Sequence, residues 1–197
     1  MRTKVHRRNA ATTRKAILAS ARQAFARVGY DGAGLREIAK GAGVTAMLVN
    51  RYFGSKERLY AEVVADTMAT PSVLTTASIN SAAPGKDIAA ALIDRTKAGA
   101  LPLDGFLIML YSLSSKRAGA IQREQIESHH QRAMTAAIRG AMAPQRAALV
   151  LSLIAGFQVM RQMIGLSALA EADSKALKKI LGPLFQFLID GRASQRR

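Results

Sequence analysis

The sequence predicts an all-α fold, and two observations support this prediction. No segment alternates apolar and polar residues as a half-buried strand would, and long segments rich in alanine, leucine, arginine and lysine carry apolar residues at helical spacing. The chain has 197 residues, of which 49% are hydrophobic, so it is long enough to bury a substantial core.

The N-terminal third is expected to hold four helices. The first should begin at Thr12 or Thr13, because threonine caps helix N-termini, and should end at Gly29. A turn is expected over residues 29–34. The other three helices are expected over residues 35–42, 45–53 and 56–69, the last of them capped by Ser55.

Serine, threonine, alanine, asparagine and proline dominate residues 71–85, which predicts a loop there. Apolar spacing predicts further helices beyond it. Pro183 should kink or break the last one, because proline lacks a backbone N–H. These helices are expected over residues 87–98, 103–115, 120–142, 144–169 and 173–190.

The formal net charge of +16 is concentrated near the N-terminus. Residues 1–60 carry 13 Lys and Arg against Asp31, Glu37 and Glu57, a net +10, and the remaining residues carry 16 against 10. A basic module on a less charged body favours a polyanionic partner, either nucleic acid or an anionic membrane.

Residues 35–53 fit two short helices that cross around a tight turn. Ala39 is small where the helices would touch, and Gly43 stands where the turn needs a left-handed backbone. The pattern predicts a helix-turn-helix, although the spacing alone also fits a plain three-helix bundle with a polar outer face. The apolar positions that would pack inward are Ile38, Ala42, Val44, Val49 and Tyr52.

The second helix of a helix-turn-helix enters the major groove of DNA. Asn50 can make two hydrogen bonds to adenine, and Arg51 can pair with guanine or a phosphate. Arg36 and Lys56 stand at the starts of neighbouring helices, where free backbone N–H groups favour phosphates. The residues expected to face the groove are Thr45, Ala46, Met47, Asn50 and Arg51.

A basic arm over residues 1–11 precedes these helices. Its arginines and its lysine could follow the DNA backbone or enter the minor groove. They are Arg2, Lys4, Arg7 and Arg8.

The stretch from Thr13 to Val63 resembles the N-terminal domain of TetR family regulators. The resemblance is carried by Gly-Tyr at 29–30, Leu-Arg-Glu-Ile-Ala at 35–39, Ala-Gly-Val-Thr at 42–45 and Tyr-Phe-Gly-Ser-Lys-Glu-Arg-Leu at 52–59. It implies that Tyr52 and Lys56 contact phosphates. Two positions depart from the family pattern: Gly34 replaces a capping Thr or Ser that touches phosphate, and Asn50 replaces the usual tyrosine and so alters which bases can be read.

The resemblance implies a DNA-binding domain over residues 1–55 and a helical effector-binding and dimerisation domain over residues 56–197. It also implies a homodimer on a palindromic site in double-stranded DNA, and a repressor that a small-molecule effector releases. The helix expected over 144–169 is apolar nearly all round and needs cover on two sides, as a dimer would provide. The expected interface residues are Leu153, Phe157, Leu177, Ile180, Leu181, Leu184 and Leu188.

An apolar effector pocket would suit methionine and aromatic side chains, because thioethers adapt to varied ligands, although the same residues also suit an ordinary core. The candidates are Phe106, Met109, Leu110, Met134, Met160 and Met163.

Other functional classes find less support. The sequence has no cysteine, no glycine-rich phosphate loop and no metal-ligand spacing, so we expect no enzyme, cofactor or metal. The adjacent His129 and His130 would point about 100° apart on a helix, so they are not expected to share a metal. A membrane-surface protein and a nonspecific architectural DNA protein are the alternatives. The longest uncharged apolar stretch, residues 147–160, is shorter than the roughly 20 residues that span a bilayer, and no secretory signal is seen, which favours a cytoplasmic protein without a membrane partner.

Overall fold

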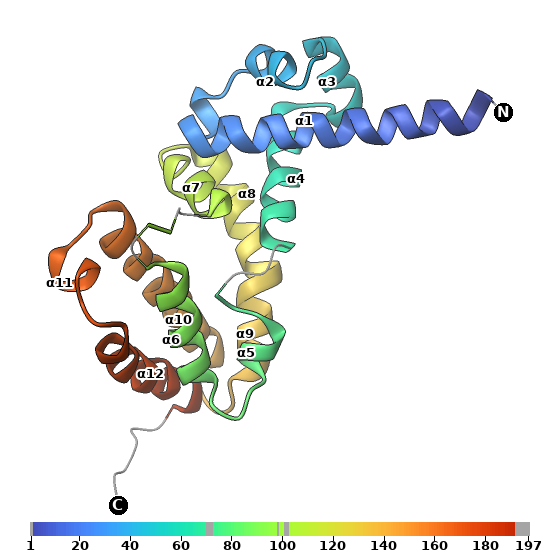
Figure 1. Cartoon of the computed structure of the whole chain (residues 1–197). Coiled ribbons are helices and arrows are strands. Elements are labelled where there is room, and N and C mark those ends of the chain that lie inside the picture. The colour runs from blue at the N-terminus through green and yellow to red at the C-terminus, as the bar shows by residue number, and fades with distance from the viewer. Residues whose placement is uncertain (1, 70–72, 98, 101–102, 192–197) are drawn as a thin grey trace, which may run out of the picture. The chain divides into compact units, whose positions relative to one another are not determined.

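The computed structural model describes residues 2–69, 73–97, 99–100 and 103–191, and for residues 2–9 it describes the backbone only. Every regular element in these ranges is helical, which confirms the all-α prediction. The chain divides into two compact units (Figure 1). The first unit comprises residues 1–70 and 103–125, and the second unit comprises residues 71–102 and 126–197.

The first unit is built around its N-terminal helix. Figure 1 shows α2 and α3 on one side of α1, with α4, α7 and α8 on the other side. The helices are α1 (Arg2–Gly32), α2 (Leu35–Gly41), α3 (Ala46–Phe53), α4 (Lys56–Ala69), α7 (Asp104–Tyr111) and α8 (Lys116–Ile126).

Helix α1 differs from its expected bounds at both ends. It begins at Arg2, so the predicted start at Thr12 or Thr13 is wrong; alanine and arginine upstream favour helix, and threonine is tolerated inside one. The predicted end at Gly29 corresponds to a sharp break, because this glycine has φ 69° and ψ −176°. Helical turns resume as far as Gly32, where only a turn was expected.

Aromatic rings form the centre of the first unit's core. The ring of Tyr60 lies edge-on to Phe25 and to Tyr30, with centroids 5.0 Å and 4.9 Å apart. The Tyr60 hydroxyl accepts a hydrogen bond from the amide of Gln122 at 2.5 Å, and both side chains are buried. Helix α8 therefore belongs to the packing of the N-terminal helices.

The corner between α7 and α8 is bound to the end of α1. The backbone N–H of Tyr30 donates to Ser112 Oγ at 2.9 Å, and Ser115 Oγ donates to Asp31 Oδ1 at 3.2 Å. A Cβ added to Gly29 would lie 2.1 Å from the carbonyl oxygen of Tyr111, so only glycine fits that approach. The compact first unit therefore extends beyond residue 55. The boundary expected at residue 55 separates functional domains and stays a prediction.

The second unit is a set of helices around its own core. Helix α12 packs along α6 (Figure 1), and the two approach closely at Gly85, where an added Cβ would lie 2.6 Å from the carbonyl oxygen of Gly182. The elements are α5 (Thr76–Ile79), α6 (Pro84–Arg95), η1 (Glu127–Gln131), α9 (Arg132–Ala137), α10 (Ala143–Gln158), η2 (Val159–Met163), α11 (Ser167–Ala170) and α12 (Ser174–Asp190).

Three expectations for these helices need correction. The predicted loop over 71–85 contains α5, which Thr75 and Ser78 stabilise as a capping box. The long helices expected over 120–142 and 144–169 each contain a π-helical turn, η1 and η2, and end at residues 137 and 163. Helix α12 includes Pro183 without ending there; the proline is exposed, so water can satisfy the carbonyl that loses its partner.

By length and composition, one helical stretch among the described residues, Ala143–Met163, could cross a membrane. Only 28% of its apolar window is buried, which leaves much of it facing outward. Its inward residues, among them Val150 and Phe157, belong to the core of the second unit. Within the described ranges, no group of three or more His, Cys, Asp or Glu side chains is placed to hold a metal ion.

Candidate functional site

Helices α2 and α3 form the predicted helix-turn-helix. Ile38 and Ala39 are buried, and Ser20 Oγ on α1 donates to the carbonyl oxygen of Ile38 at 2.8 Å. In the turn, the N–H of Val44 donates to the carbonyl of Ala39 at 2.9 Å. Gly34 caps α2 with no side-chain hydrogen bond, as its residue type requires.

Helix α3 begins at a side-chain cap and presents its polar face outward. Thr45 Oγ1 accepts a hydrogen bond from the N–H of Leu48 at 3.3 Å, which stabilises the first turn. Val49 and Phe53 are buried against the first unit's core. Of the residues expected to face a groove, Ala46 is half-buried, and the exposed ones are Thr45, Met47, Asn50 and Arg51.

Three polar side chains on this surface have no partner within the described residues. Arg36, Asn50 and Arg51 are exposed, and none makes a hydrogen bond or an ion pair there. By contrast, Arg27 on α1 pairs with Glu37. Unpartnered donors on an exposed helix can bind a ligand without first breaking internal contacts, which is what reading DNA requires.

Lys56 lies at the start of α4 with its charge against an aromatic ring. Its Nζ is 4.7 Å from the centroid of the Tyr30 ring and donates to the carbonyl oxygen of Asp31 at 3.5 Å. Ammonium groups have three donors, so one or two remain for a phosphate. Tyr52, the other implied phosphate contact, is half-buried at the end of α3.

A network of polar groups holds this corner. Burial raises the pKa of Tyr30, and the nearby Glu57 carboxylate raises it further. The pKa of Glu57 is lowered by the hydrogen bond from its own backbone N–H and then by Ser55. Arg117 on α8 pairs with Glu57 at 2.6 Å. Arg117 was not among the predicted site residues, because its partner is distant in the sequence.

The side chains of the basic arm, Arg2, Lys4, Arg7 and Arg8, lie outside the described residues. The backbone there continues α1.

The six candidate pocket residues are divided between the two units. Phe106, Met109 and Leu110 belong to the first unit, and Met134, Met160 and Met163 belong to the second. Met134 is fully buried in the second unit's core, whereas Met160 is exposed. Their role in an effector pocket stays a prediction.

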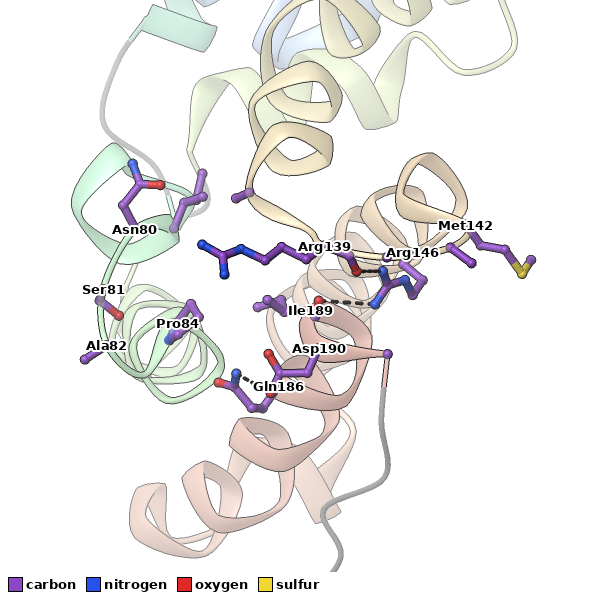
Figure 2. A pocket seen from close by; sticks show the side chains of 15 residues that line it. Asn80, Ser81, Ala82, Pro84, Arg139, Met142, Arg146, Gln186, Ile189 and Asp190 are labelled. Atoms are coloured by element: carbon purple, nitrogen blue, oxygen red, sulfur yellow. Dashed lines mark hydrogen bonds between the residues drawn. The ribbon is translucent and has the colours of Figure 1, made fainter.

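The second unit contains a cavity of about 1190 Å³ between the α5–α6 turn, the α9–α10 turn and the end of α12 (Figure 2). None of the six candidates lines it. Arg139 and Arg146 do line it, and sequence reasoning missed both because turns far apart in the chain form this cavity.

Another arginine that sequence reasoning missed is buried in the second unit. Arg161, in η2, is 6% exposed and donates to the carbonyl oxygen of Ile93 at 3.3 Å and to Thr96 Oγ1 at 3.1 Å. Burial lowers the pKa of its guanidinium. The contacts hold the C-terminal end of α6, where a cation also meets the helix dipole favourably.

The expected dimer-interface residues fall into two groups. Phe157, Leu177 and Leu181 are buried within the second unit, and Leu153 and Leu188 are half-buried. Ile180 and Leu184 are exposed, at 61% and 46%. Together with Leu149, Met160 and Phe187, they are the exposed large apolar side chains of α10, η2 and α12, and this set is called the exposed apolar face.

Two family models match the chain. Residues 17–63 match the model described as bacterial regulatory proteins of the tetR family, and residues 83–189 match the model for the tetracyclin repressor-like C-terminal domain. Together they cover most of both units. No curated protein matches the chain.

Solved structures with a similar fold are also found. A TetR-family regulator from Streptomyces coelicolor A3 is 25% identical, with a TM-score of 0.63 over 91% of this chain and 95% of that one. The transcriptional regulator FadR from Bacillus subtilis, solved in complex with stearoyl-CoA, is 17% identical, with a TM-score of 0.65 over 90% of this chain and 98% of that one. A putative transcriptional regulator from Streptomyces coelicolor is 24% identical, with a TM-score of 0.60 over 89% and 97%.

Proposed function

The chain belongs to the TetR family of DNA-binding transcription regulators, and on that premise we propose that it is a repressor that binds a palindromic operator as a homodimer and leaves it when a small molecule binds. The observation that carries this proposal is the exposed, unpartnered face of α3, with Asn50 and Arg51 supported from behind by a packed helix-turn-helix. Adenine and guanine are the bases that these side chains select best.

Phosphate contacts set the register of α3 in the groove. Arg36 and Lys56 are placed at the starts of α2 and α4, and Tyr52 lies between them in sequence at the end of α3. Because Gly34 offers no hydroxyl, α2 contributes one phosphate contact fewer than a Thr or Ser cap would give.

A second copy of the chain is the proposed cover for the exposed apolar face. Leu149 on α10 and Ile180, Leu184 and Phe187 on α12 are about half exposed or more, and a soluble protein rarely leaves such a patch open. A two-fold dimer would bury it and would place two α3 helices for successive major grooves. Because a second copy of the chain would cover the Ala143–Met163 stretch, its apolar side chains would need no lipid around them. The proposal is therefore a cytoplasmic protein without a membrane partner.

Effector release follows from coupling between two sites. If an effector in the second unit favours a conformation whose α3 helices no longer fit the operator, operator DNA must weaken effector binding by the same factor. We propose no catalytic activity, since the relatives found by both comparisons are regulators.

Selection of bound duplexes from a random DNA library tests the proposal. Purified protein at near-physiological salt should enrich a palindromic consensus with half-sites about one helical turn apart. A reporter gene behind that consensus should then be silenced when the protein is expressed. Binding without any consensus, falling steeply with salt, would instead identify an architectural DNA protein and reject the proposal.

A further inference from the structure

The lining of the cavity in the second unit includes apolar side chains, although polar atoms contribute more of its surface. Ile79 and Ile189 are nearly buried members of the unit's core, and both line the cavity together with Pro84 and Ala137. An aliphatic chain laid over them would extend that core and leave water. All lining residues belong to the second unit, so the shape of the cavity depends on this unit alone.

Two of the charged residues at the rim are already engaged. The guanidinium of Arg146 donates to the carbonyl oxygens of Ile189, at 3.2 Å, and Arg139, which ties the end of α12 to the α9–α10 turn. Asp190 accepts a hydrogen bond from Gln186 Nε2 at 2.9 Å, and Gln186 Oε1 accepts one from the N–H of Gly85 at 2.9 Å. These groups build the wall of the cavity.

Arg139 is different, because its guanidinium is uncommitted. The side chain is exposed and makes no ion pair or hydrogen bond within the described residues. Figure 2 shows it extending across the cavity toward the α5–α6 turn that carries Asn80 and Pro84. A guanidinium offers a planar pair of N–H donors that matches a carboxylate.

The backbone around the cavity also favours a negatively charged ligand. Helices α6 and α10 begin at Pro84 and Ala143. In α6 the N–H of Gly85 already donates to Gln186, whereas α10 has no side-chain hydrogen bond at its N-cap, Met142. Pro84 and Met142, at those two helix starts, line the cavity. The uncapped N-terminus of α10 carries partial positive charge, which adds to the charge of Arg139.

We propose that this cavity binds an aliphatic monocarboxylate, with the carboxylate on Arg139 and the chain over Ile79 and Ile189. Binding itself does not depend on the regulatory role of the protein. The further step, that such a ligand is the effector, rests on the function proposed above.

Isothermal titration of the full-length protein with decanoate tests the proposal. Saturable binding of one decanoate per chain is expected. Acetate, which has the charge without the chain, and decan-1-ol, which has the chain without the charge, should both bind much more weakly.

Substitutions locate the site. Arg139→Gln should weaken decanoate binding by about tenfold or more, as expected for losing a charge-assisted pair of hydrogen bonds. Arg132→Gln is the matched control, because Arg132 is an exposed arginine of α9 that does not line the cavity, and it should bind as the unchanged protein does. Unsaturable binding, equal binding of decan-1-ol, or equal loss in both variants would overturn the proposal.

The role as effector is measured separately. If decanoate binds through Arg139 and weakens operator binding, the site and the release mechanism both stand. If it binds through Arg139 and leaves operator affinity unchanged, the carboxylate site stands and the proposed release by this ligand fails.

Discussion

Replacing Gly29 with alanine should destabilise the first unit strongly. At φ 69° and ψ −176° an L-residue occupies a region that is essentially restricted to glycine, which costs about 1–3 kcal/mol. The new Cβ would also lie 2.1 Å from the carbonyl oxygen and 2.7 Å from the carbonyl carbon of Tyr111, which are backbone atoms that cannot rotate away. Relief by moving the α7–α8 corner would strain the bond from the Tyr30 N–H to Ser112, and overpacking of this kind costs about 1–3 kcal/mol. The total is about 2–6 kcal/mol.

Gly43→Ala provides the matched control for this change. Gly43 has nearly the same φ, 68°, but a Cβ there would meet nothing within 4 Å. It should therefore lose only the backbone term, about 1–2 kcal/mol. The difference between the two variants reports the contact with the Tyr111 carbonyl together with the extended ψ of −176° at Gly29.

Tyrosine fluorescence during urea unfolding can measure this difference in the first unit alone. The chain has no tryptophan and four tyrosines, at positions 30, 52, 60 and 111, all of which belong to the first unit. The Gly29→Ala midpoint should fall well below that of Gly43→Ala. Equal midpoints would show that α7 does not constrain the end of α1, and would refute the assignment of the α7–α8 corner to this unit.

Three further predictions concern burial, pH and assembly. Gln122→Met should cost the first unit about 1–3 kcal/mol in the same urea assay, because the buried Tyr60 hydroxyl loses its donor; an unchanged midpoint would contradict this. Burial lowers the pKa of His130, and the charge of His129 lowers it further. Below about pH 6.5 the unfolded chain therefore binds more protons than the folded chain does, so the second unit should lose stability as the pH falls. His130→Gln should flatten that loss in far-UV circular dichroism melts, and an equally steep loss would rule out this histidine as the cause. Gly156 is exposed on α10, one helical turn before Met160 of the exposed apolar face, so Gly156→Gln should obstruct a dimer there and yield monomers in light scattering. Gly119→Gln on α8 should leave the dimer intact, and a Cβ meets nothing within 4 Å at either position. Dimers of both variants would argue against α10 as the interface.

Local chemistry made the helix-turn-helix predictable from sequence. Thr45 and Ser55 cap α3 and α4 as their residue types suggested, with Oγ atoms that accept from Leu48 and Arg58. The helical period separated inward residues such as Val49 from outward ones such as Asn50. Each of these signals lies within a few residues of the feature it predicts.

Features that depend on distant segments left no comparable signal. The contact of Gly29 with Tyr111, and the bond between Tyr30 and Ser112, join residues about eighty positions apart, and they draw α7 and α8 into the first unit. Apolar residues of α12 such as Leu181 and Ile180 look alike in sequence, yet the first is buried in the second unit and the second is exposed. Which apolar residue faces a partner depends on packing that periodicity alone does not resolve.

The proposed reading of bases by α3 is tested most directly by repeating the duplex selection with three variants. Asn50→Ala should change the consensus at specific positions, because it removes a side chain placed for base edges, whereas Lys56→Gln should weaken binding to every sequence and leave the consensus intact. An unchanged consensus for both Asn50→Ala and Arg51→Ala would contradict the account, since it would mean that the exposed face of α3 does not select the sequence.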